Sequence, residues 1–253
     1  METDPKKTPI DLTGSVALVT GGGRGLGRAF ALALAAAGAQ VVVTARTAAQ
    51  VAETVELIEG AGGSALALPS DVSVPDEVTH LVATAEQLGP VDILVNNAGV
   101  AGPMGALWEV DPEDWWRTVA INLRGPFLCA RAVLPGMVRR HRGRIVNISS
   151  GAAYNRLPQL DAYCASKAAL THWTKCLAIE TKAQGIAVFA FAPGTVRTAG
   201  TEYLWHLYGL TRACRRRQTA SARTSLPLFP AAEPQRCYDF QCQELATTFF
   251  RSS

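Results

Sequence analysis

The chain has 253 residues, 48% of them hydrophobic and 18% charged, a balance typical of a globular protein with a substantial core. Residues 1–200 carry 17 basic and 17 acidic side chains, so the formal net charge of +3 comes from residues 201–253 and the body offers no basic face for nucleic acid. The polar N-terminus and the lack of an apolar run near the ~20 residues that cross a bilayer predict a cytoplasmic protein that does not bind membranes.

Cysteines and histidines give no metal-binding pattern. The six cysteines include no C-x-x-C pair, and the four histidines are scattered along the chain. This spacing disfavours a zinc site, so we expect no bound metal. We interpret Cys129, Cys164 and Cys176 as small, reduced, half-buried residues of a cytosolic protein.

The first 200 residues alternate short β-branched runs with longer helical patterns. Strands are expected at 15–20, 40–45, 64–69, 91–96, 143–149 and 186–193, and helices at 25–37, 48–59, 75–88, 112–140 and 162–183. Because the strands are almost entirely apolar, helices should cover both faces of the sheet. The pattern predicts an α/β fold: a doubly wound parallel sheet of the Rossmann type in three αβα layers, with ligands at the carboxyl ends of the strands.

The first expected strand is followed by TGGGRGLG at residues 20–27. Gly21, Gly25 and Gly27 give the spacing G-x-x-x-G-x-G, and Leu26 lies between the last two. Glycine lets the backbone approach a pyrophosphate closely, and the helix that follows offers its positive N-terminus. This loop between a strand and a helix therefore predicts a dinucleotide site.

The second expected strand leads into TAR at residues 44–46, where an NAD site would carry an acid for the ribose 2′-hydroxyl. No acidic residue occurs from 41 to 52, and Arg46 takes that place. Arg24, in the glycine loop, could reach the same group. Two guanidiniums suit a 2′-phosphate, so we expect NADP(H) to be preferred, with NAD(H) as the alternative cofactor.

Two further segments follow strands and face the expected crevice. Asp71 and Val72 could flank an adenine ring, although Asp71 could equally help to start the helix at Pro75. Asn97, Ala98 and Gly99 belong to NNAG, whose small residues and amides suit a backbone that runs close to a cofactor ribose.

The stretch YCASK places Tyr163 and Lys167 four residues apart, on one face of an expected helix. A nearby ammonium favours the phenolate and lowers the pKa of a phenol toward neutrality. The alternative is a surface pair in which the tyrosine packs on the lysine stem. Because NISS ends the fifth expected strand, Ser150 should lie at the same edge of the sheet.

Six motifs then occur in a characteristic order: TGGGRGLG, NNAG, INLRG at 121–125, NISS, YCASK and APGTVRT at 192–198. Together they resemble a classical short-chain dehydrogenase/reductase over residues 10–200. The resemblance implies an oxidoreductase that interconverts a carbonyl and a secondary alcohol by hydride transfer with an NAD(P) cofactor.

The resemblance also implies roles for individual residues. Tyr163 would be the general acid or base, Lys167 would lower its pKa and hold the nicotinamide ribose, and Ser150 would donate a hydrogen bond to the substrate oxygen. Asn122 would extend a proton relay from Lys167 toward water. The segment that contacts the nicotinamide carboxamide would comprise Pro193, Gly194, Val196 and Thr198.

After Thr198 the sequence resembles the family less closely. Residues 201–210 suit a helix of a substrate lid, but 211–253 show no strand with the expected final turn and contain an arginine cluster. We therefore divide the chain into a catalytic Rossmann domain, 1–200, and a partial lid with a divergent basic tail, 201–253. A homodimer through the helices at 112–140 and 162–183 is expected, whereas a tetramer that uses the last strand is doubtful.

Alternatives to this interpretation involve the tail. One is a cofactor-binding protein with impaired or no catalysis, because an aberrant C-terminus cannot complete the pocket. The other is an anion-binding tail through its arginine cluster, which we rank lower because short arginine runs are usually solvated. The expected substrate is a small carbonyl compound or alcohol, and Tyr154 and Leu157 suggest a moderately apolar one.

Overall fold

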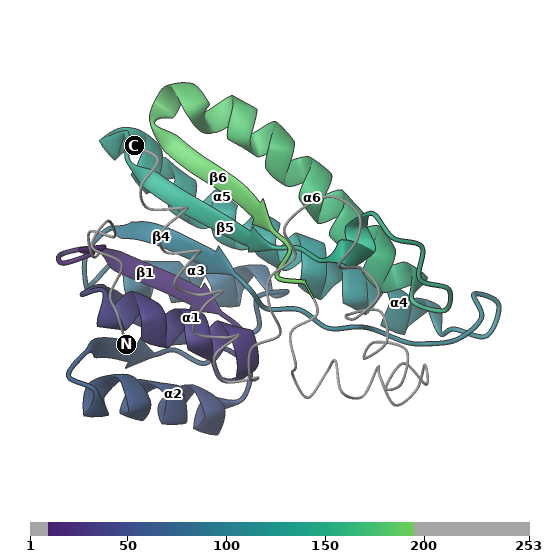
Figure 1. The fold of residues 1–253 in the computed structure, drawn as a ribbon, viewed down its shortest axis with the longest axis horizontal. Coiled ribbons are helices and arrows are strands. Elements are labelled where there is room, and N and C mark those ends of the chain that lie inside the picture. The colour runs from purple at the N-terminus through teal and green to yellow at the C-terminus, as the bar shows by residue number, and fades with distance from the viewer. Residues whose placement is uncertain (1–9, 195–253) are drawn as a thin grey trace, which may run out of the picture.

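The computed structural model describes residues 10–194, which form one six-stranded parallel sheet in the order β3-β2-β1-β4-β5-β6 (Figure 1). The strands are β1 Val16–Thr20, β2 Gln40–Thr44, β3 Ser64–Ala67, β4 Val91–Asn96, β5 Gly143–Ile148 and β6 Ile186–Phe191. The order reverses between β1 and β4, which is where a doubly wound sheet opens its ligand crevice. The predicted doubly wound parallel sheet is confirmed.

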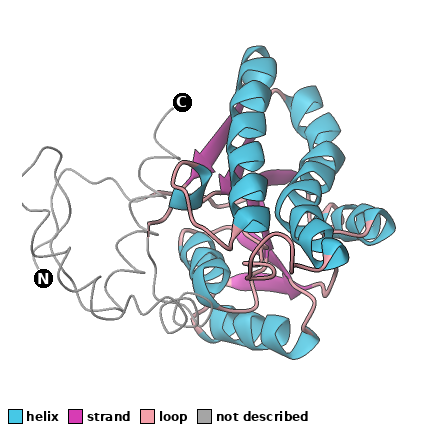
Figure 2. Ribbon diagram, turned by 90° about the vertical axis from the view of Figure 1, so that its right-hand side faces the viewer, coloured by secondary structure: helices cyan, strands magenta, loops and turns pink. Residues whose placement is uncertain are grey.

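Helices pack on both faces of this sheet (Figure 2). The helices are α1 Gly25–Ala36, α2 Ala48–Gly60, α3 Pro75–Ala85, α4 Pro112–Val119, α5 Gly125–Arg140 and α6 Asp161–Thr181. Side chains of α1 and α2 pack on one face, and side chains of α3, α5 and α6 pack on the other. The fold therefore has the expected three αβα layers.

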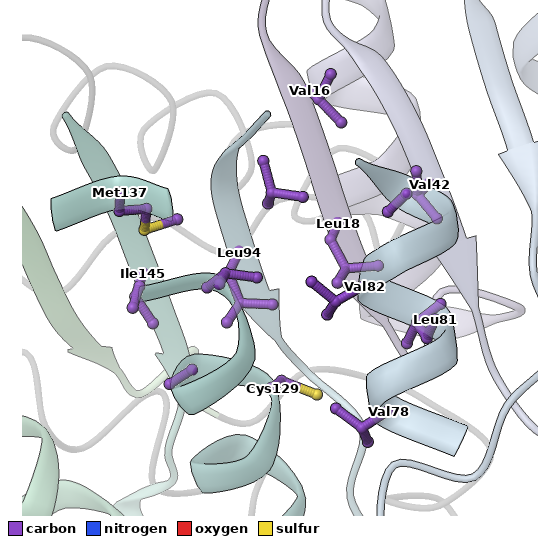
Figure 3. Packing of buried hydrophobic residues seen from close by; sticks show 14 of the residues in the cluster. Val16, Leu18, Val42, Val78, Leu81, Val82, Leu94, Cys129, Met137 and Ile145 are labelled. Atoms are coloured by element: carbon purple, nitrogen blue, oxygen red, sulfur yellow. The ribbon is translucent and has the colours of Figure 1, made fainter. Parts of the chain in front are cut away.

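Successive strand residues contribute to opposite cores because their side chains alternate across the sheet. Val19 and Val43 join α1 and α2 in one cluster, while Leu18, Val42 and Leu94 join α3 and α5 in the other. Figure 3 shows the second cluster, in which side chains of α3 face those of the strands. Double burial explains why these strands are apolar at nearly every position.

The starts of two helices follow from local sequence. Pro75 and Pro112 occupy the first turns of α3 and α4, where a missing N–H costs nothing. The Asp111 side chain caps α4 by accepting hydrogen bonds from the backbone N–H groups of Glu113 at 2.8 Å and Asp114 at 3.1 Å.

The prediction of one continuous helix over residues 112–140 is wrong, because this segment is divided in the structure. A π-helical turn, Ala120–Arg124, separates α4 from α5 and contains Asn122. Such turns insert one residue into the helical ladder and are frequent at functional sites. Two short 3₁₀ helices, Gly151–Ala153 and Lys182–Gln184, border α6.

Several sequence-based predictions concern residues outside 10–194. They are the roles of Val196 and Thr198, the lid helix at 201–210, the domain division at residue 200 and the missing final strand. Within the described residues, no helix is both long and apolar enough to span a membrane. The thiols of Cys129, Cys164 and Cys176 are free, but only Cys164 is half-buried, since Cys129 is buried and Cys176 is exposed.

Candidate active site

The glycine loop packs directly against the end of β4. Gly21 has a left-handed backbone (φ 63°), and a Cβ atom there would lie 2.8 Å from the Ala98 Cα. The Asn97 Nδ2 donates hydrogen bonds to the carbonyl oxygens of Thr20 at 3.0 Å and Gly21 at 3.1 Å. A side chain at residue 21 would therefore separate the two segments, which explains the glycine.

Side chains of α1 and α2 hold the middle of the same loop. The Arg28 Nη2 donates to the Gly23 carbonyl at 2.6 Å, and the same guanidinium forms an ion pair with Glu53 at 2.7 Å. The Thr54 Oγ1 lies 3.0 Å from the Gly22 carbonyl. Because C=O and N–H of a trans peptide point in opposite directions, the N–H groups of Gly23 and Arg24 point away from these partners.

A cavity of about 450 Å³ opens along the carboxyl ends of β1, β2 and β4. Eleven predicted cofactor residues line it: Gly21, Arg24, Gly25, Leu26, Gly27, Arg46, Asp71, Val72, Asn97, Ala98 and Gly99. The prediction omitted seven others: Gly23, Ala45, Thr47, Gln50, Ser70, Val100 and Ile121. Five of these seven follow a strand directly or within four residues, so examining each strand end could have found them; Gln50 and Ile121 lie in helical segments.

Positive charge borders one part of this cavity. Arg24 and Arg46 are both exposed along its lining. Burial by itself would raise the pKa of Asp71, but hydrogen bonds from Ser73 and the charges of Arg46 and Arg117 together lower it. Asp71 also accepts from the Ser73 N–H at 2.9 Å, just before α3, so it both lines the cavity and shapes the turn into that helix.

Ser150 and Tyr163 meet beside the end of β5. Ser150 precedes the 3₁₀ helix Gly151–Ala153 and accepts a hydrogen bond from the Ala152 N–H at 3.2 Å. Tyr163 lies in the first turn of α6, with its side chain beside that of Ser150. Burial raises the pKa of Tyr163, and the neighbouring Ser150 hydroxyl lowers it by less.

Lys167 is buried one turn further along α6. Its Nζ donates to the Ile148 carbonyl at 2.8 Å and lies 5.8 Å from the centre of the Tyr163 ring. Burial lowers the pKa of Lys167 to about 8. The expected lowering of the Tyr163 pKa is wrong for the chain alone, because burial of the phenol dominates and the ammonium is directed at a backbone oxygen.

Asn122 lies beside the cavity, close to Lys167. Its Nδ2 donates to the Val100 carbonyl at 2.9 Å and to Ser166 Oγ at 3.0 Å, and its Oδ1 accepts from the Val100 N–H at 2.8 Å. These bonds tie the side chain to Val100 and Ser166 and not to Lys167. A Cβ on Gly99 would lie 3.2 Å from the Asn122 Oδ1 and 3.5 Å from the Lys167 Nζ, so all three border one small space.

The remaining predicted residues follow β6. Pro193 and Gly194 follow the end of this strand after Ala192, at the carboxyl edge of the sheet, and Gly194 has a left-handed φ of 73°. In the described part of the chain, no three side chains of His, Cys, Asp or Glu come together in a way that could hold a metal ion. The site thus combines a glycine-lined cavity, two arginines and a Ser–Tyr–Lys group at one end.

Known proteins are similar to this chain in both sequence and fold. The family model of the short chain dehydrogenases matches residues 15–207. A short chain dehydrogenase of the fungus Pseudocercospora fijiensis is 41% identical over 77% of this chain, and the match covers 63% of that protein, just under two thirds of its length. The 3-oxoacyl-[acyl-carrier-protein] reductase of Synechocystis is 42% identical over 76% of this chain and 78% of its own.

The chain belongs to the short-chain dehydrogenase/reductase family.

Solved structures of this family superpose on it. A structure described as a short-chain alcohol dehydrogenase from Sinorhizobium meliloti is 36% identical, with a TM-score of 0.81, and covers 96% of this chain and 95% of its own. A metagenomic short-chain oxidoreductase in complex with NADP is 37% identical, with a TM-score of 0.70, and covers 79% of this chain and 90% of its own. The family places this chain among the oxidoreductases that act on CH–OH groups with NAD(P).

Proposed function

We propose that this short-chain dehydrogenase/reductase is an NADP(H)-dependent enzyme that interconverts a carbonyl and a secondary alcohol, with Ser150, Tyr163 and Lys167 as its catalytic residues. One observation carries the proposal. The lining of the cavity beside the glycine loop includes Gly99, which borders Lys167, and Tyr163 lies one helical turn from Lys167 beside Ser150.

The cavity fits a dinucleotide. Gly21 forms a close backbone contact that leaves no room for a Cβ atom, and the N-terminus of α1 opens onto the lining beside it. The Gly loop and α1 would hold the pyrophosphate, Asp71 and Val72 the adenine, and Asn97 to Gly99 the ribose nearer the nicotinamide. Pro193, Gly194, Val196 and Thr198 would contact the carboxamide. When bound, the cofactor supplies or accepts the hydride.

The charges beside the cavity support NADP(H) over NAD(H). Arg24 and Arg46 line it after β1 and β2, and the acidic residue of an NAD site is absent from residues 41–52. Two guanidiniums can neutralise and grip a 2′-phosphate. The structural relative in complex with NADP has the same fold, which agrees with this preference.

Two side chains of the protein would bind the substrate oxygen and supply its proton. Ser150 donates a hydrogen bond that polarises the carbonyl, and the phenol of Tyr163 delivers the proton during reduction. Burial raises the pKa of Tyr163, so the phenol stays protonated at neutral pH, as a general acid requires. Lys167 holds the end of β5 and would bind the ribose, and Asn122 would carry the proton path onward from this small space toward water.

The substrate is proposed to be a moderately apolar carbonyl compound or its alcohol. Tyr154 and Leu157 follow the Ser150 turn and are exposed by 69% and 40%. Because one relative is a 3-oxoacyl reductase, a β-keto ester belongs in the first substrate panel, beside an aromatic ketone and an α-diketone.

The free thiols of the described cysteines agree with a cytoplasmic location.

Cofactor titration separates the two nucleotides. The purified full chain should bind NADPH at micromolar concentrations and NADH more weakly when nucleotide fluorescence is followed. Arg46→Asp should weaken NADPH binding by about tenfold or more, since a repulsive carboxylate replaces a phosphate ligand. Arg139→Asp makes the same charge change at the far end of α5 and should have no effect. Equal NADPH affinity in both variants would contradict the assigned preference.

A homodimer through α5 and α6 is part of the proposal. These helices border a groove of about 600 Å³. On their surfaces Phe127 is exposed by 46% and Ile179 by 79%, so a second copy would cover apolar area. Ile179→Glu should convert the dimer to a monomer in light scattering, whereas Leu57→Glu on α2, also exposed, should not. A wild-type monomer would refute the interface.

A further inference from the structure

The face of α6 that packs on β5 is polar, whereas the buried face of a helix is usually apolar. Lys167, Thr171 and Thr174 are spaced i, i+4 and i+7 and therefore share one face of the helix. All three are buried, with exposed fractions of 4%, 4% and 2%. Only Lys167 has a role in the proposed chemistry, so the two threonines need another explanation.

Each of the three side chains is bonded to a different residue at the end of β5. Lys167 Nζ donates to the Ile148 carbonyl at 2.8 Å. Thr171 Oγ1 lies 2.5 Å from Ser149 Oγ, and Thr174 Oγ1 accepts from Asn147 Nδ2 at 2.9 Å. Three consecutive residues, the last two of β5 and Ser149 directly after it, are thus bound to α6 by hydrogen bonds.

The protons of the central pair can be assigned. Thr171 Oγ1 donates to the Lys167 carbonyl at 2.8 Å. Because a hydroxyl has one proton, the 2.5 Å contact must be donated by Ser149 and accepted by Thr171. Ser149 is itself only 5% exposed, and the chain Ser149–Thr171–Lys167 joins the residue before Ser150 to the lysine backbone.

We propose that Ser149 and Thr171 are positioning residues that fix the register of α6 along β5 and so hold Tyr163 at Ser150. Apolar packing alone is non-directional and sets the position of a helix along a strand weakly, whereas a hydrogen bond tolerates only a narrow range of distances and angles. Ser150 directly follows Ser149, and Tyr163 lies two turns before Thr171 on the same helix. This inference rests on the proposed function for its kinetic consequence only.

Four variants separate positioning from stability. Thr171→Val keeps the shape of the side chain but leaves the buried Ser149 hydroxyl without its acceptor, so the melting temperature should fall. Ser149→Ala removes the donor instead. The double variant removes both partners, and because no buried donor is then orphaned, its melting temperature should return toward that of the wild type. Thr171→Ser retains the hydroxyl and serves as the conservative control.

Activity should not follow stability. With NADPH and ethyl acetoacetate, kcat should fall about tenfold or more in Thr171→Val, Ser149→Ala and the double variant, since small displacements at a reacting centre have large effects. Cofactor affinity should be unchanged, and Thr171→Ser should recover most of kcat. A double variant with wild-type kcat would show that the pair is only structural and would overturn the proposal.

A second readout needs no substrate. The ionisation of Tyr163 can be followed by phenolate absorbance as the difference between each protein and the same protein carrying Tyr163→Phe. Moving Tyr163 away from the Ser150 hydroxyl removes an influence that lowers the pKa of Tyr163, so the midpoint should move to higher pH in the double variant. An unmoved midpoint would refute the positioning role. If ethyl acetoacetate is not reduced by the wild type, the proposed function fails on that substrate while this titration still decides the inference.

Discussion

Replacing Lys167 should change how the stability of the fold depends on pH. Burial lowers the pKa of Lys167 from 10.5 to about 8. Between these values the folded protein has released a proton that the unfolded chain still holds, so raising the pH favours the folded state. At about 1.4 kcal/mol per pH unit, the stability penalty at neutral pH is about 3 kcal/mol. Lys167→Met removes this penalty and loses the bond to Ile148, which is worth about 2 kcal/mol for a charged donor.

The variant should therefore be more stable than the wild type near neutral pH, by about 1 kcal/mol, and lose that advantage by about pH 9. Urea unfolding at a series of pH values measures this difference directly. Lys175→Met, an exposed lysine on the same helix, should follow the wild-type profile. A difference between Lys167→Met and the wild type that stays constant within about 0.5 kcal/mol over this range would show that the buried Lys167 does not titrate in this range.

Three further outcomes follow from contacts in the structure. Gly21→Ala should abolish NADPH binding while the chain still folds, because its Cβ would lie 2.8 Å from the Ala98 Cα; a titration with unchanged affinity would contradict the close contact. Arg28→Met should weaken NADPH and NADH binding alike, because the Arg28 side chain orients the glycine loop through its 2.6 Å bond to the Gly23 carbonyl and does not contact the 2′-position of the nucleotide. A selective loss of affinity for one nucleotide would count against this role. In native protein, iodoacetamide should label the exposed Cys176 and spare the buried Cys129, because burial raises the pKa of the Cys129 thiol to about 12. Peptide mapping that finds Cys129 modified would show that the core opens readily.

Much of the fold could be predicted because its signals are local. Six apolar strands separated by helical patterns determine the sheet, and Pro75 and Pro112 mark two helix starts that the structure reproduces. The glycine loop could be placed because it follows a strand and precedes a helix. These signals depend only on neighbours in the sequence, which is why they needed no tertiary information.

Other features depend on contacts between distant segments and could not be predicted. The π-helical turn at Asn122 is stabilised by bonds to Val100 and Ser166, which lie 22 and 44 residues away. The pKa of Tyr163 is governed by burial, which spacing within YCASK does not reveal. The Ser149–Thr171 pair likewise joins a strand to a helix, and each residue alone resembles any small polar side chain.

Transfer of a labelled hydride shows whether the protein reduces a carbonyl with Tyr163 as the proton donor. The full chain would be incubated with NADPH deuterated at the transferable position and ethyl acetoacetate, and the alcohol analysed by mass spectrometry. We expect deuterium on the new carbinol carbon with wild-type protein, and none with Tyr163→Phe even though that variant still binds NADPH. Unlabelled product, or equal labelling by Tyr163→Phe, would contradict this expectation.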